Sequence, residues 1–401
     1  MKDEKKAPKL RFKGFTDDWE QCKLGDLADR VTTKNKGMVS ELPLTISAQD
    51  GLISQDEFFN KKVASKDLSS YLLLHHGDFA YNKSYSNGYP FGTIKRLEKY
   101  PQGVVSSLYI AFKPNSSISS DFMAQYYESN NWHKEIYKCA AEGARNHGLL
   151  NVPPSDFFAT NLNIPITKSE QLKIGRLLNA VDQTITLHEE KKRQLERLKS
   201  ALLQKMFADK SGYPPVRFEG FSDKWEQVKY GEIFQRRSKM GVSTPTLPSV
   251  EYDDINPGMG TLNKEPKSKG ISKRGIYFNP GDVLFGKLRP YLKNWLFACF
   301  EGVAVGDFWV LTSSKIDHGF TYSLIQTPGF QYIANLSSGS KMPRSDWGLV
   351  SNARTFIPIN HLEQERISSV LFGLDHAITL YEHKLEILNK IKSFLLQNMF
   401  I

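Results

Sequence analysis

Two long segments of the chain place apolar residues at alternating steps of three and four positions. This spacing is the heptad pattern of a coiled coil and predicts two long helices. Both helices are expected to start after a proline and a Glu-Gln pair and to run for about 38 residues, or about 57 Å. The pattern in residues 357–400 is interrupted only near Lys392, and in residues 164–207 His188 and Lys192 lie within it. The apolar positions are Ile174, Leu178, Val181, Ile185, Leu195 and Leu202 in the first segment, and Ile367, Leu371, Leu374, Ile378, Tyr381, Leu385, Leu388, Leu395 and Met399 in the second.

The same two segments are copies of one another. Residues 164–207 align with residues 357–400 at an offset of 193, with 21 of 44 positions identical. Residues 11–30 align with residues 217–236 at an offset of 206, with 11 of 20 identical. Chance alignment of sequences with ordinary composition gives only about 6% identity. The chain is therefore an internal repeat of two halves in tandem.

The parts between the repeated segments share little sequence. Residues 31–163 and 237–356 contain short β-rich runs separated by Gly, Pro, Ser and Asn, with a few short helices. We expect strands within Val104 to Phe112, Val303 to Leu311, Gly275 to Phe278 and Asp282 to Phe285, and a helix over residues 121–139. The two halves thus have similar terminal segments and different middle segments, residues 31–163 and 237–356. This layout suggests one shared attachment surface and two different recognition surfaces. If the two long helices pack on each other with pseudo-two-fold symmetry, they run antiparallel.

Composition narrows the class of protein. Of 401 residues, 40% are hydrophobic and 24% are charged, as in ordinary globular proteins. The sequence contains no run of about 18 apolar residues, the length needed to span a membrane. Its first residues also lack the apolar core of a secretory signal. The three cysteines, Cys22, Cys139 and Cys299, are too far apart in sequence for a CxxC metal or redox site. We therefore expect a cytoplasmic, metal-free protein.

Positive charge is concentrated in one part of the chain. The net charge is +10, from 53 Lys and Arg against 43 Asp and Glu. Residues 264–293 alone hold eight basic and two acidic residues, interleaved with Tyr and Pro, and Trp295 follows just after this window. Such a window suggests an anionic partner, although basic charge by itself does not identify one.

The repeated motifs resemble those of a known family. A P-x-[LV]-R-F-x-G-F-x-x-x-W motif lies at Pro8 to Trp19 and again at Pro214 to Trp225. An I-P-I-x-x-x-E-Q segment that ends in LLQ-x-MF closes each half, at residues 164–207 and 357–400. In these features the chain resembles the specificity (S) subunit of Type I restriction–modification enzymes. The resemblance covers the whole chain, and the run Gly281 to Leu292 is also similar to one in the recognition domains of this family.

The resemblance implies a fold and a set of partners. The expected fold is mixed α/β (α+β), with two globular target-recognition domains in tandem, joined by two long antiparallel coiled-coil helices. Each domain would read one part of a bipartite, asymmetric target in double-stranded DNA. The helices would set the spacer between the parts and, through the apolar positions given above, pair and dock two methylation subunits. Restriction/translocase subunits would join this core. S-adenosylmethionine, ATP and Mg would be bound by those partners, with no cofactor in this chain. The expected segments are 1–163, first target-recognition domain; 164–207, central helix; 208–216, linker; 217–356, second target-recognition domain; and 357–401, distal helix.

Catalytic motifs are absent from the sequence. Gly281 to Lys287 fits GxxxxGK, but Leu288 follows where a P-loop has Ser or Thr, and residues 283–285 read as a strand. We find no HExxH, GxSxG or NPP[YF] motif, and we expect a non-catalytic subunit. Two alternatives from other classes remain at this point: a self-sufficient DNA methyltransferase or nuclease with degenerate motifs, and a coiled-coil scaffold that does not bind DNA. The specificity subunit of a two-part Type II-like system is a near neighbour.

Candidate DNA contacts are basic, amide and hydroxyl side chains in glycine-rich loops of each middle. Such side chains bind phosphates or the edges of bases. Residues after the Gly77-Asp78 turn occupy the place in the first half that residues after the Gly281-Asp282 turn occupy in the second. The loops that begin at Gly143 and Gly339 are likewise equivalent by order. The candidates are Lys83, Ser84, Tyr85, Asn87, Arg145, Asn146, His147, Lys273, Arg274, Lys287, Arg289, Tyr291, Lys293, Asn294, Lys341, Arg344 and Ser345.

Overall fold

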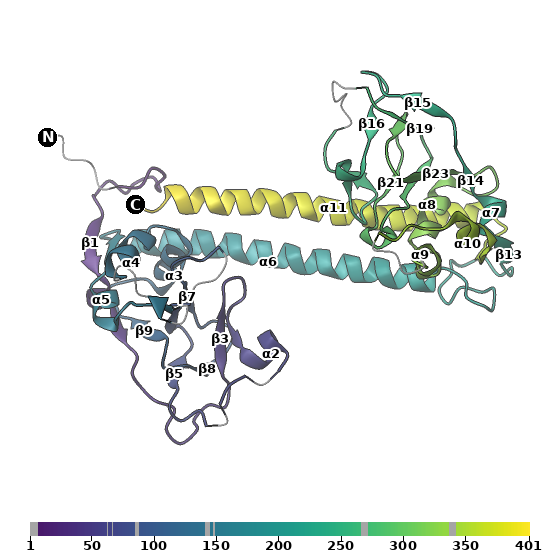
Figure 1. Ribbon diagram of the computed structural model, residues 1–401. Coiled ribbons are helices and arrows are strands. Elements are labelled where there is room, and N and C mark those ends of the chain that lie inside the picture. The colour runs from purple at the N-terminus through teal and green to yellow at the C-terminus, as the bar shows by residue number, and fades with distance from the viewer. Residues whose placement is uncertain are drawn as a thin grey trace. The chain divides into compact units, whose positions relative to one another are not determined.

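The computed structural model shows a mixed α/β protein with two very long helices (Figure 1). It describes residues 7–401 except Lys62, Lys66 and residues 85–87, 141–144, 147–148, 266–271 and 337–341; for Arg145, Asn146 and Leu149 it describes only the backbone. The chain divides into two compact units. The first unit is Met1–Leu187 together with Glu386–Ile401, and the second is His188–Leu385.

The two long helices are those predicted from the heptad pattern. They are α6 (Lys168–Lys205) and α11 (His361–Asn398), each 38 residues long as expected. The Glu-Gln pair of each repeat lies in the first turn of its helix rather than before it. Both helices are divided between the two units, because each end packs into a globular core. This grouping differs from the five consecutive segments expected from the sequence, which keep each helix separate.

The first unit contains short strands and helices around one end of each long helix. Its four-stranded sheet has the order β2-β9-β6-β7, and β1 pairs antiparallel with β12. The strands are β1 (Glu20–Lys23), β2 (Ala28–Arg30), β3 (Leu44–Ser47), β4 (Gly51–Ser54), β5 (Leu72–His75), β6 (Phe79–Asn82), β7 (Thr93–Arg96), β8 (Gln102–Val105), β9 (Ile110–Pro114), β10 (Arg145–Asn146), β11 (Leu149–Leu150) and β12 (Asn161–Ile164). The short helices are α1 (Leu24–Leu27), α2 (Gln55–Phe59), α3 (Ser120–Glu128), α4 (His133–Cys139) and α5 (Pro154–Phe158).

The second unit repeats this plan with a second four-stranded sheet. Its sheets have the orders β14-β23-β20-β21 and β15-β19-β22-β16, and β13 pairs antiparallel with β24. The strands are β13 (Glu226–Lys229), β14 (Gln235–Arg236), β15 (Met240–Val242), β16 (Ser249–Val250), β17 (Ile255–Asn256), β18 (Thr261–Leu262), β19 (Arg274–Phe278), β20 (Val283–Gly286), β21 (Trp295–Phe297), β22 (Gly302–Ala304), β23 (Phe308–Thr312) and β24 (Arg354–Ile357). The helices are α7 (Tyr230–Ile233), η1 (Tyr252–Asp254), η2 (Pro290–Leu292), α8 (His318–Gln326), α9 (Pro328–Ala334) and α10 (Trp347–Asn352).

Corresponding strands form the matching sheets of the two units. In both, the strand after the repeated motif pairs with the strand before the long helix, as β1 with β12 and β13 with β24. The strand after each Gly-Asp turn, β6 or β20, lies in the interior of the four-stranded sheet. The sequence repeat is therefore also a structural repeat, and the predicted fold class is confirmed.

Three predicted elements are each divided into two. Residues 104–112 belong to β8 and β9 and residues 303–311 to β22 and β23, with a turn between the strands. The predicted helix over 121–139 is interrupted after Glu128, where the Ser129 hydroxyl donates to the Tyr126 carbonyl at 2.6 Å. The Trp132 indole donates to the Tyr127 carbonyl at 3.1 Å. In a continuous helix these two carbonyls at the end of α3 would accept hydrogen bonds from backbone N–H groups of the next turn. Here side chains donate to them instead, which explains the break.

A buried ion pair joins the opening motif of each half to the start of its long helix. In the first unit, Arg11 donates from Nε and Nη2 to both carboxylate oxygens of Glu170, at 2.7 and 2.8 Å. In the second unit, Arg217 binds Glu363 in the same way, at 2.7 and 2.9 Å. Both glutamate side chains are 1% exposed. The conserved geometry of the two pairs explains why the sequence repeats the arginine and the glutamate together.

The glutamine after each glutamate also bonds to backbone groups in its unit. Gln171 accepts the Ser119 backbone N–H at 2.8 Å and donates to the Pro165 carbonyl at 2.9 Å. In the second unit, Gln364 accepts from the backbone N–H at position 317 and donates to the carbonyl at position 358, both at 2.8 Å. The Glu-Gln pair therefore connects each long helix to the globular part of its own unit.

The end of one long helix completes the core of each unit. Phe400, which follows α11, contacts the rings of Trp19, Phe122 and Tyr126 in the first unit. Phe207, which follows α6, contacts Trp225 and Phe320 in the second unit. Trp19 and Trp225 are each 2% exposed, so both are core residues. The repeated LLQ-x-MF motif thus supplies aromatic and apolar side chains to both cores.

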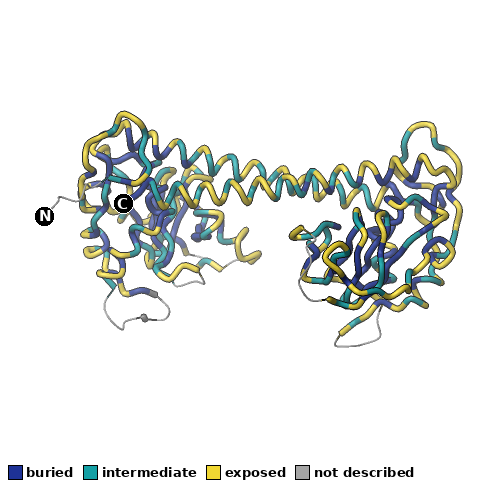
Figure 2. The backbone as a smooth tube through the Cα atoms, turned by 90° about the horizontal axis from the view of Figure 1, so that it is seen from above, coloured by how far each residue is buried: buried dark blue, intermediate teal, exposed yellow. Residues whose placement is uncertain are grey.

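Within each unit, α6 and α11 lie side by side and antiparallel. In the first unit, Asn163 contacts the Ile401 carbonyl and Asp182 contacts Lys392. In the second, Lys192 contacts Glu382 and Lys199 contacts Asp375. Each of the fourteen residues from Ile174 to Leu395 predicted for helix pairing is buried or half-buried. Figure 2 shows buried residues at the helix ends and half-buried and exposed residues in their middles.

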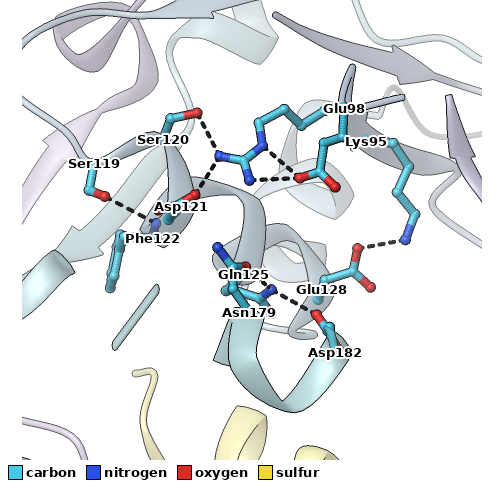
Figure 3. A network of polar contacts seen from close by, with 11 residues as sticks. Lys95, Glu98, Ser119, Ser120, Asp121, Phe122, Gln125, Glu128, Asn179 and Asp182 are labelled. Atoms are coloured by element: carbon cyan, nitrogen blue, oxygen red, sulfur yellow. Dashed lines mark hydrogen bonds and ion pairs between the residues drawn. The ribbon is translucent and has the colours of Figure 1, made fainter. Parts of the chain in front are cut away.

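Polar side chains attach the globular part of the first unit to α6 (Figure 3). Gln125 on α3 donates to Asn179 at 2.8 Å and to Asp182 at 2.9 Å, both on α6. In the same network Arg96 at the end of β7 contacts Asp121 at the start of α3 at 2.8 Å. The sheet, α3 and α6 are therefore connected by a continuous series of hydrogen bonds and ion pairs.

Removal of the arginine from one of these buried ion pairs should lower the stability of the protein strongly. Arg217→Met leaves the Glu363 carboxylate buried without its bidentate partner, and we expect a loss of about 3–5 kcal/mol in the free energy of unfolding. Urea unfolding followed by circular dichroism measures it. Arg193→Met, which removes an exposed pair with Glu190 on α6, is the matched control and should cost less than about 0.5 kcal/mol. Equal losses in the two variants would contradict the assignment.

Candidate nucleic-acid interface

Two loops of the second unit that were predicted separately lie against each other. Ser345 donates its backbone N–H to the Lys287 carbonyl at 2.8 Å, and Arg289 donates its backbone N–H to the Pro343 carbonyl at 2.7 Å. A β-bridge joins Leu288 to Arg344 between these two bonds. The loop after β20 and the segment before α10 therefore form one surface. We call residues 287–294 together with residues 342–345 the basic loop surface.

The first unit brings the equivalent segments together in the same way. Leu150 donates its backbone N–H to the Lys83 carbonyl at 3.0 Å, and Lys83 follows β6 as Lys287 follows β20. The Lys83 ammonium is directed inward, to the Val152 carbonyl at 3.3 Å. Burial lowers the pKa of Lys83 below its usual value. Ser84 is half-buried and donates its backbone N–H to Asn82.

Several predicted contacts lie outside the described residues. These are Tyr85, Asn87 and His147 in the first half and Lys341 in the second. Arg145 and Asn146 form β10, but their side chains are not described.

Asp307 organises the charges of the basic loop surface. Its carboxylate accepts from Arg344 Nε and Nη2 at 3.1 and 2.9 Å, and lies 3.6 Å from the Lys287 ammonium. Its backbone carbonyl accepts from the Lys287 backbone N–H at 2.9 Å and from the Tyr252 hydroxyl at 2.6 Å. Tyr252 also accepts from the Leu288 backbone N–H at 3.2 Å, and burial raises its pKa to about 12. Asp307 and Tyr252 therefore fix the positions of both loops.

The loop after β20 has an unusual backbone at two charged residues. Arg289 has φ 48° and Lys293 has φ 58°, in the left-handed region that non-glycine residues seldom adopt. Hydrogen bonds hold both: Arg289 N–H to the Pro343 carbonyl, and Gly258 N–H to the Lys293 carbonyl at 2.8 Å. Tyr291, between them, is 56% exposed, and Lys293 is exposed as well. The exposed side chains of Tyr291 and Lys293 therefore lie in a segment whose backbone is held by hydrogen bonds.

Two of the candidates, Ser345 and Asn294, are buried. The Ser345 hydroxyl donates to the Ala334 carbonyl at 2.7 Å, and Ser345 is 7% exposed. Asn294 is 8% exposed and its carbonyl accepts from the Gly286 N–H. Both residues stabilise the loops, and neither can reach a base without rearrangement of its surroundings.

The basic window is less positive than its sequence suggests. Lys264 pairs with Asp254 at 2.8 Å and Lys273 with Glu251 at 2.7 Å, and both acids lie outside residues 264–293. Together with the Lys287–Asp307 contact, these pairs neutralise three of its eight cations. Arg274, at the start of β19, is exposed. Within the basic loop surface, the exposed basic residues are Lys293 and Arg344.

A cleft of about 860 Å³ borders the basic loop surface. Lys287 lines it together with Arg236, Arg237 and Lys229, and Glu232 is the one acidic residue in its lining. Arg237 is held by the buried Asp282 at 2.5 and 3.0 Å. Arg236 lies over the ring of Trp347, 4.6 Å from its centroid. Cations beside aromatic rings suit a polyanion with planar groups.

Sequence patterns alone did not identify Asp307, Tyr252, Arg236 or Trp347 as parts of this region. The pairing of β20 with β23 sets Gly286 opposite Phe308, which brings Asp307 beside Lys287. The basic loop follows β20, and β20 pairs with β23. A sequence-based signal would therefore have been the acidic residue directly before β23. Arg236 lies at the end of the repeated motif, where both halves have arginine, but its contact with Trp347 depends on the fold.

The described residues contain neither a metal cluster nor a membrane-spanning helix. No three His, Cys, Asp or Glu side chains among them could together hold a metal ion. Of the helices in the described ranges, none has the length and apolarity needed to cross a membrane. The GxxxxGK match at Gly281 to Lys287 is not a phosphate-binding loop, because Val283–Gly286 forms β20 in the interior of a sheet.

The fold is similar to that of solved S subunits. The Type-I restriction-modification system S subunit from M. genitalium is 16% identical, with a TM-score of 0.64 over 98% of this chain and 99% of that chain. A chain from a study of complex assembly and conformational transition of the type I R-M system is 16% identical, with a TM-score of 0.48 over 95% and 97%. The HsdS subunit from Thermoanaerobacter tengcongensis is 15% identical, with a TM-score of 0.42 over 96% and 97%. No protein-family model matches the chain. At these identities the likeness concerns the fold, and it agrees with the resemblance found in the repeated motifs.

The role of Tyr252 can be measured by removing one oxygen. Tyr252→Phe leaves the Asp307 carbonyl and the Leu288 N–H without their hydroxyl partner, and we expect a loss of about 1–3 kcal/mol in the free energy of unfolding. Tyr291→Phe, at an exposed tyrosine of the same surface, is the control and should change stability little. Chemical unfolding of both variants tests this, and a stability loss confined to Tyr291→Phe would refute it.

Proposed function

We propose that this chain is the DNA-specificity subunit of a Type I restriction–modification enzyme. In this proposal it has no catalytic activity of its own, and each unit reads one part of a bipartite, asymmetric target. The observation that carries the proposal is the repeated meeting of two loops in each unit, Lys83 with Leu150 and Lys287 with Ser345. Two similar frameworks that present different loops suit a reader of two different half-sites. The full-length likeness in fold to an S subunit supports the same conclusion.

The proposed mechanism is positional. Lys293, Arg344 and Arg274 bind phosphates or base edges at the second unit, since arginine and lysine contact both. The cleft beside Lys287 extends this positive surface through Arg236 and Lys229, for which the described residues include no ion pair. At the first unit the corresponding loops present other residues, so the two half-sites differ.

Partner subunits supply the chemistry in this proposal. Two methylation subunits carry S-adenosylmethionine and flip the target base from the duplex. Restriction/translocase subunits carry ATP and Mg. The assembly acts in the cytoplasm. Support for docking on the helices comes from an apolar row on α11 that faces away from the predicted seam. Its members are Leu380, Ile387, Ile391 and Phe394, between 42% and 57% exposed.

An exchange of one recognition segment tests the proposal directly. Replacing residues 24–160, the part between β1 and β12, by the matching part of another protein with this fold should change one part of the DNA target. The other part and the spacer should stay the same, because they belong to the second unit and to the helices. Sequencing of methylated DNA from cells that carry the exchanged chain with its methylation subunits gives the result.

The same experiment includes a control for catalysis. The chain alone, with DNA and labelled S-adenosylmethionine, should transfer no methyl groups, while the complex should. Sustained transfer by the chain alone would favour an independent methyltransferase. A change in both parts of the target, or in neither, would refute the proposal that each unit reads one part.

Lys293 provides a prediction about electrostatics. If its ammonium binds a phosphate, Lys293→Gln should weaken binding to all duplexes by a similar factor. The slope of log K against log salt concentration should fall by about 0.9, which corresponds to one released counterion. Fluorescence anisotropy of a labelled duplex, titrated with the chain and its methylation subunits at several salt concentrations, measures the affinity and its salt dependence. Lys210→Gln, at an exposed lysine of the linker, is the control, and an equal effect there would remove the support for a specific contact.

A further inference from the structure

Lysine occupies three heptad positions, 192, 199 and 392, where the paired helices otherwise have mostly apolar residues, and two of these lysines are equivalent in the repeat. Lys199 on α6 lies four residues after Leu195, and Lys392 on α11 lies four residues after Leu388. Their side chains are only 12% and 23% exposed. The two lysines occupy equivalent positions in the repeated segments, at the offset of 193. A lysine at such a position lowers the stability of the helix pair unless its charge has a partner.

Each of these lysines contacts an aspartate on the other helix. Lys392 lies 2.7 Å from Asp182 in the first unit, and Lys199 forms a close ion pair with Asp375 in the second. The two aspartates are also equivalent in the repeat. From Asp182 to Lys199 is 17 residues forward along α6, and from Lys392 to Asp375 is 17 residues back along α11. The two pairs therefore specify one and the same alignment of the helices.

The aspartates also contact the globular part of their own unit. Asp182 accepts from Gln125 on α3 at 2.9 Å (Figure 3). Asp375 is 8% exposed; burial raises its pKa, while Lys199 and then Tyr322 of α8 act in the opposite direction. Asp182 thus connects α6, α11 and α3, while Asp375 connects α11 with α6 and lies close to Tyr322 of α8.

Apolar residues alone do not determine the alignment of two such helices. Leu, Ile and Val recur every heptad, so a shift by seven residues replaces one apolar contact by another. The charges discriminate against a shift. Relative to Lys392, a shift of one heptad would place Leu385 or Met399 opposite Asp182. An aspartate facing an apolar side chain loses its ion pair and keeps the cost of its partial desolvation, which is larger for Asp375, 8% exposed, than for Asp182, 32% exposed.

We propose that the Asp182–Lys392 and Lys199–Asp375 pairs are positioning residues that select the register of α6 against α11. Their role is to exclude other alignments, and the apolar residues of the seam supply the stability. Because the register determines how each helix meets its sheet domain, it also limits the spacing at which the two units can read DNA. This last step rests on the proposed function; the register itself does not.

Distance measurements between spin labels test the register without DNA. Labels at Arg197 and His376, exposed residues near the second pair, are introduced into the full-length chain after replacement of Cys22, Cys139 and Cys299 by serine. The unchanged seam should give one narrow distance distribution by pulsed electron paramagnetic resonance. A variant with leucine at all four charged positions should give additional distances, since a shift of one heptad moves a label by about 10.5 Å along the helix axis.

Two further variants separate register from stability. The fully swapped chain, D182K/K392D/K199D/D375K, keeps opposite charges face to face and should recover the single narrow distance. The variant K199D/K392D sets aspartate against aspartate and should not. These two decide the question even if the leucine variant does not fold. The matched control is K192Q/E382Q, which removes a more exposed pair of the same seam and should leave the distance unchanged.

The outcomes distinguish this inference from the proposed function. One narrow distance in the leucine variant, or no recovery in the swapped chain, would overturn the assignment. With methylation subunits present, the leucine variant should methylate targets of more than one spacer length, and the swapped chain only the original spacer. Recovery of the distance together with no methylation of DNA by any of these chains would leave the register assignment intact and refute the proposed function.

Discussion

A buried carboxylate at the start of each long helix is the constraint on which the rest of the structure depends. Glu170 and Glu363 are almost inaccessible to water, and an ionised carboxylate in such a place is tolerated only with a well-placed partner. The partner is an arginine of the opening motif, bound through two parallel hydrogen bonds. Each bidentate pair fixes distance and orientation together. The entry of the chain into each unit and the first turn of the long helix are therefore positioned by one interaction.

This constraint explains why the repeated segments lie at the ends of each half. In the second unit the Trp225 indole donates to Glu363, which Arg217 also binds, and packs against Phe207 of the LLQ-x-MF motif. In the first unit Trp19 packs against Phe400 of that motif. In the first unit the last residues of the chain take part, since Met399 and Phe400 belong to its core cluster. Residues between these motifs are free to differ as long as they return the chain through β12 or β24 to the helix. The surface formed between these motifs can thus change without loss of the framework.

The parts of the fold that follow a local rule could be predicted from the sequence. The helices are visible because their apolar spacing persists over 38 residues, and Trp19 and Trp225 because they lie within a repeated motif. The strands were predicted too long, because an apolar run such as Val303 to Leu311 does not reveal the turn within it. The role of Asp307 could not be predicted, since it depends on the pairing of β20 with β23, a contact between segments over 20 residues apart. Local patterns do not contain that information.

The charge of the candidate interface illustrates the same limit in energetic terms. Counted along the sequence, residues 264–293 form a strongly positive window, but an ion pair depends on distance in space, and Glu251, Asp254 and Asp307 approach this window from elsewhere in the unit. An acid beside a lysine reduces its attraction for a phosphate and also restricts its side chain. Specific recognition benefits from this restriction, because a base contact requires a fixed side chain, whereas non-specific attraction requires only charge. In the proposed function, the Asp307 cluster therefore favours Arg344 as a residue that reads position or sequence, and Lys293, which is exposed, is suited to a simple phosphate contact.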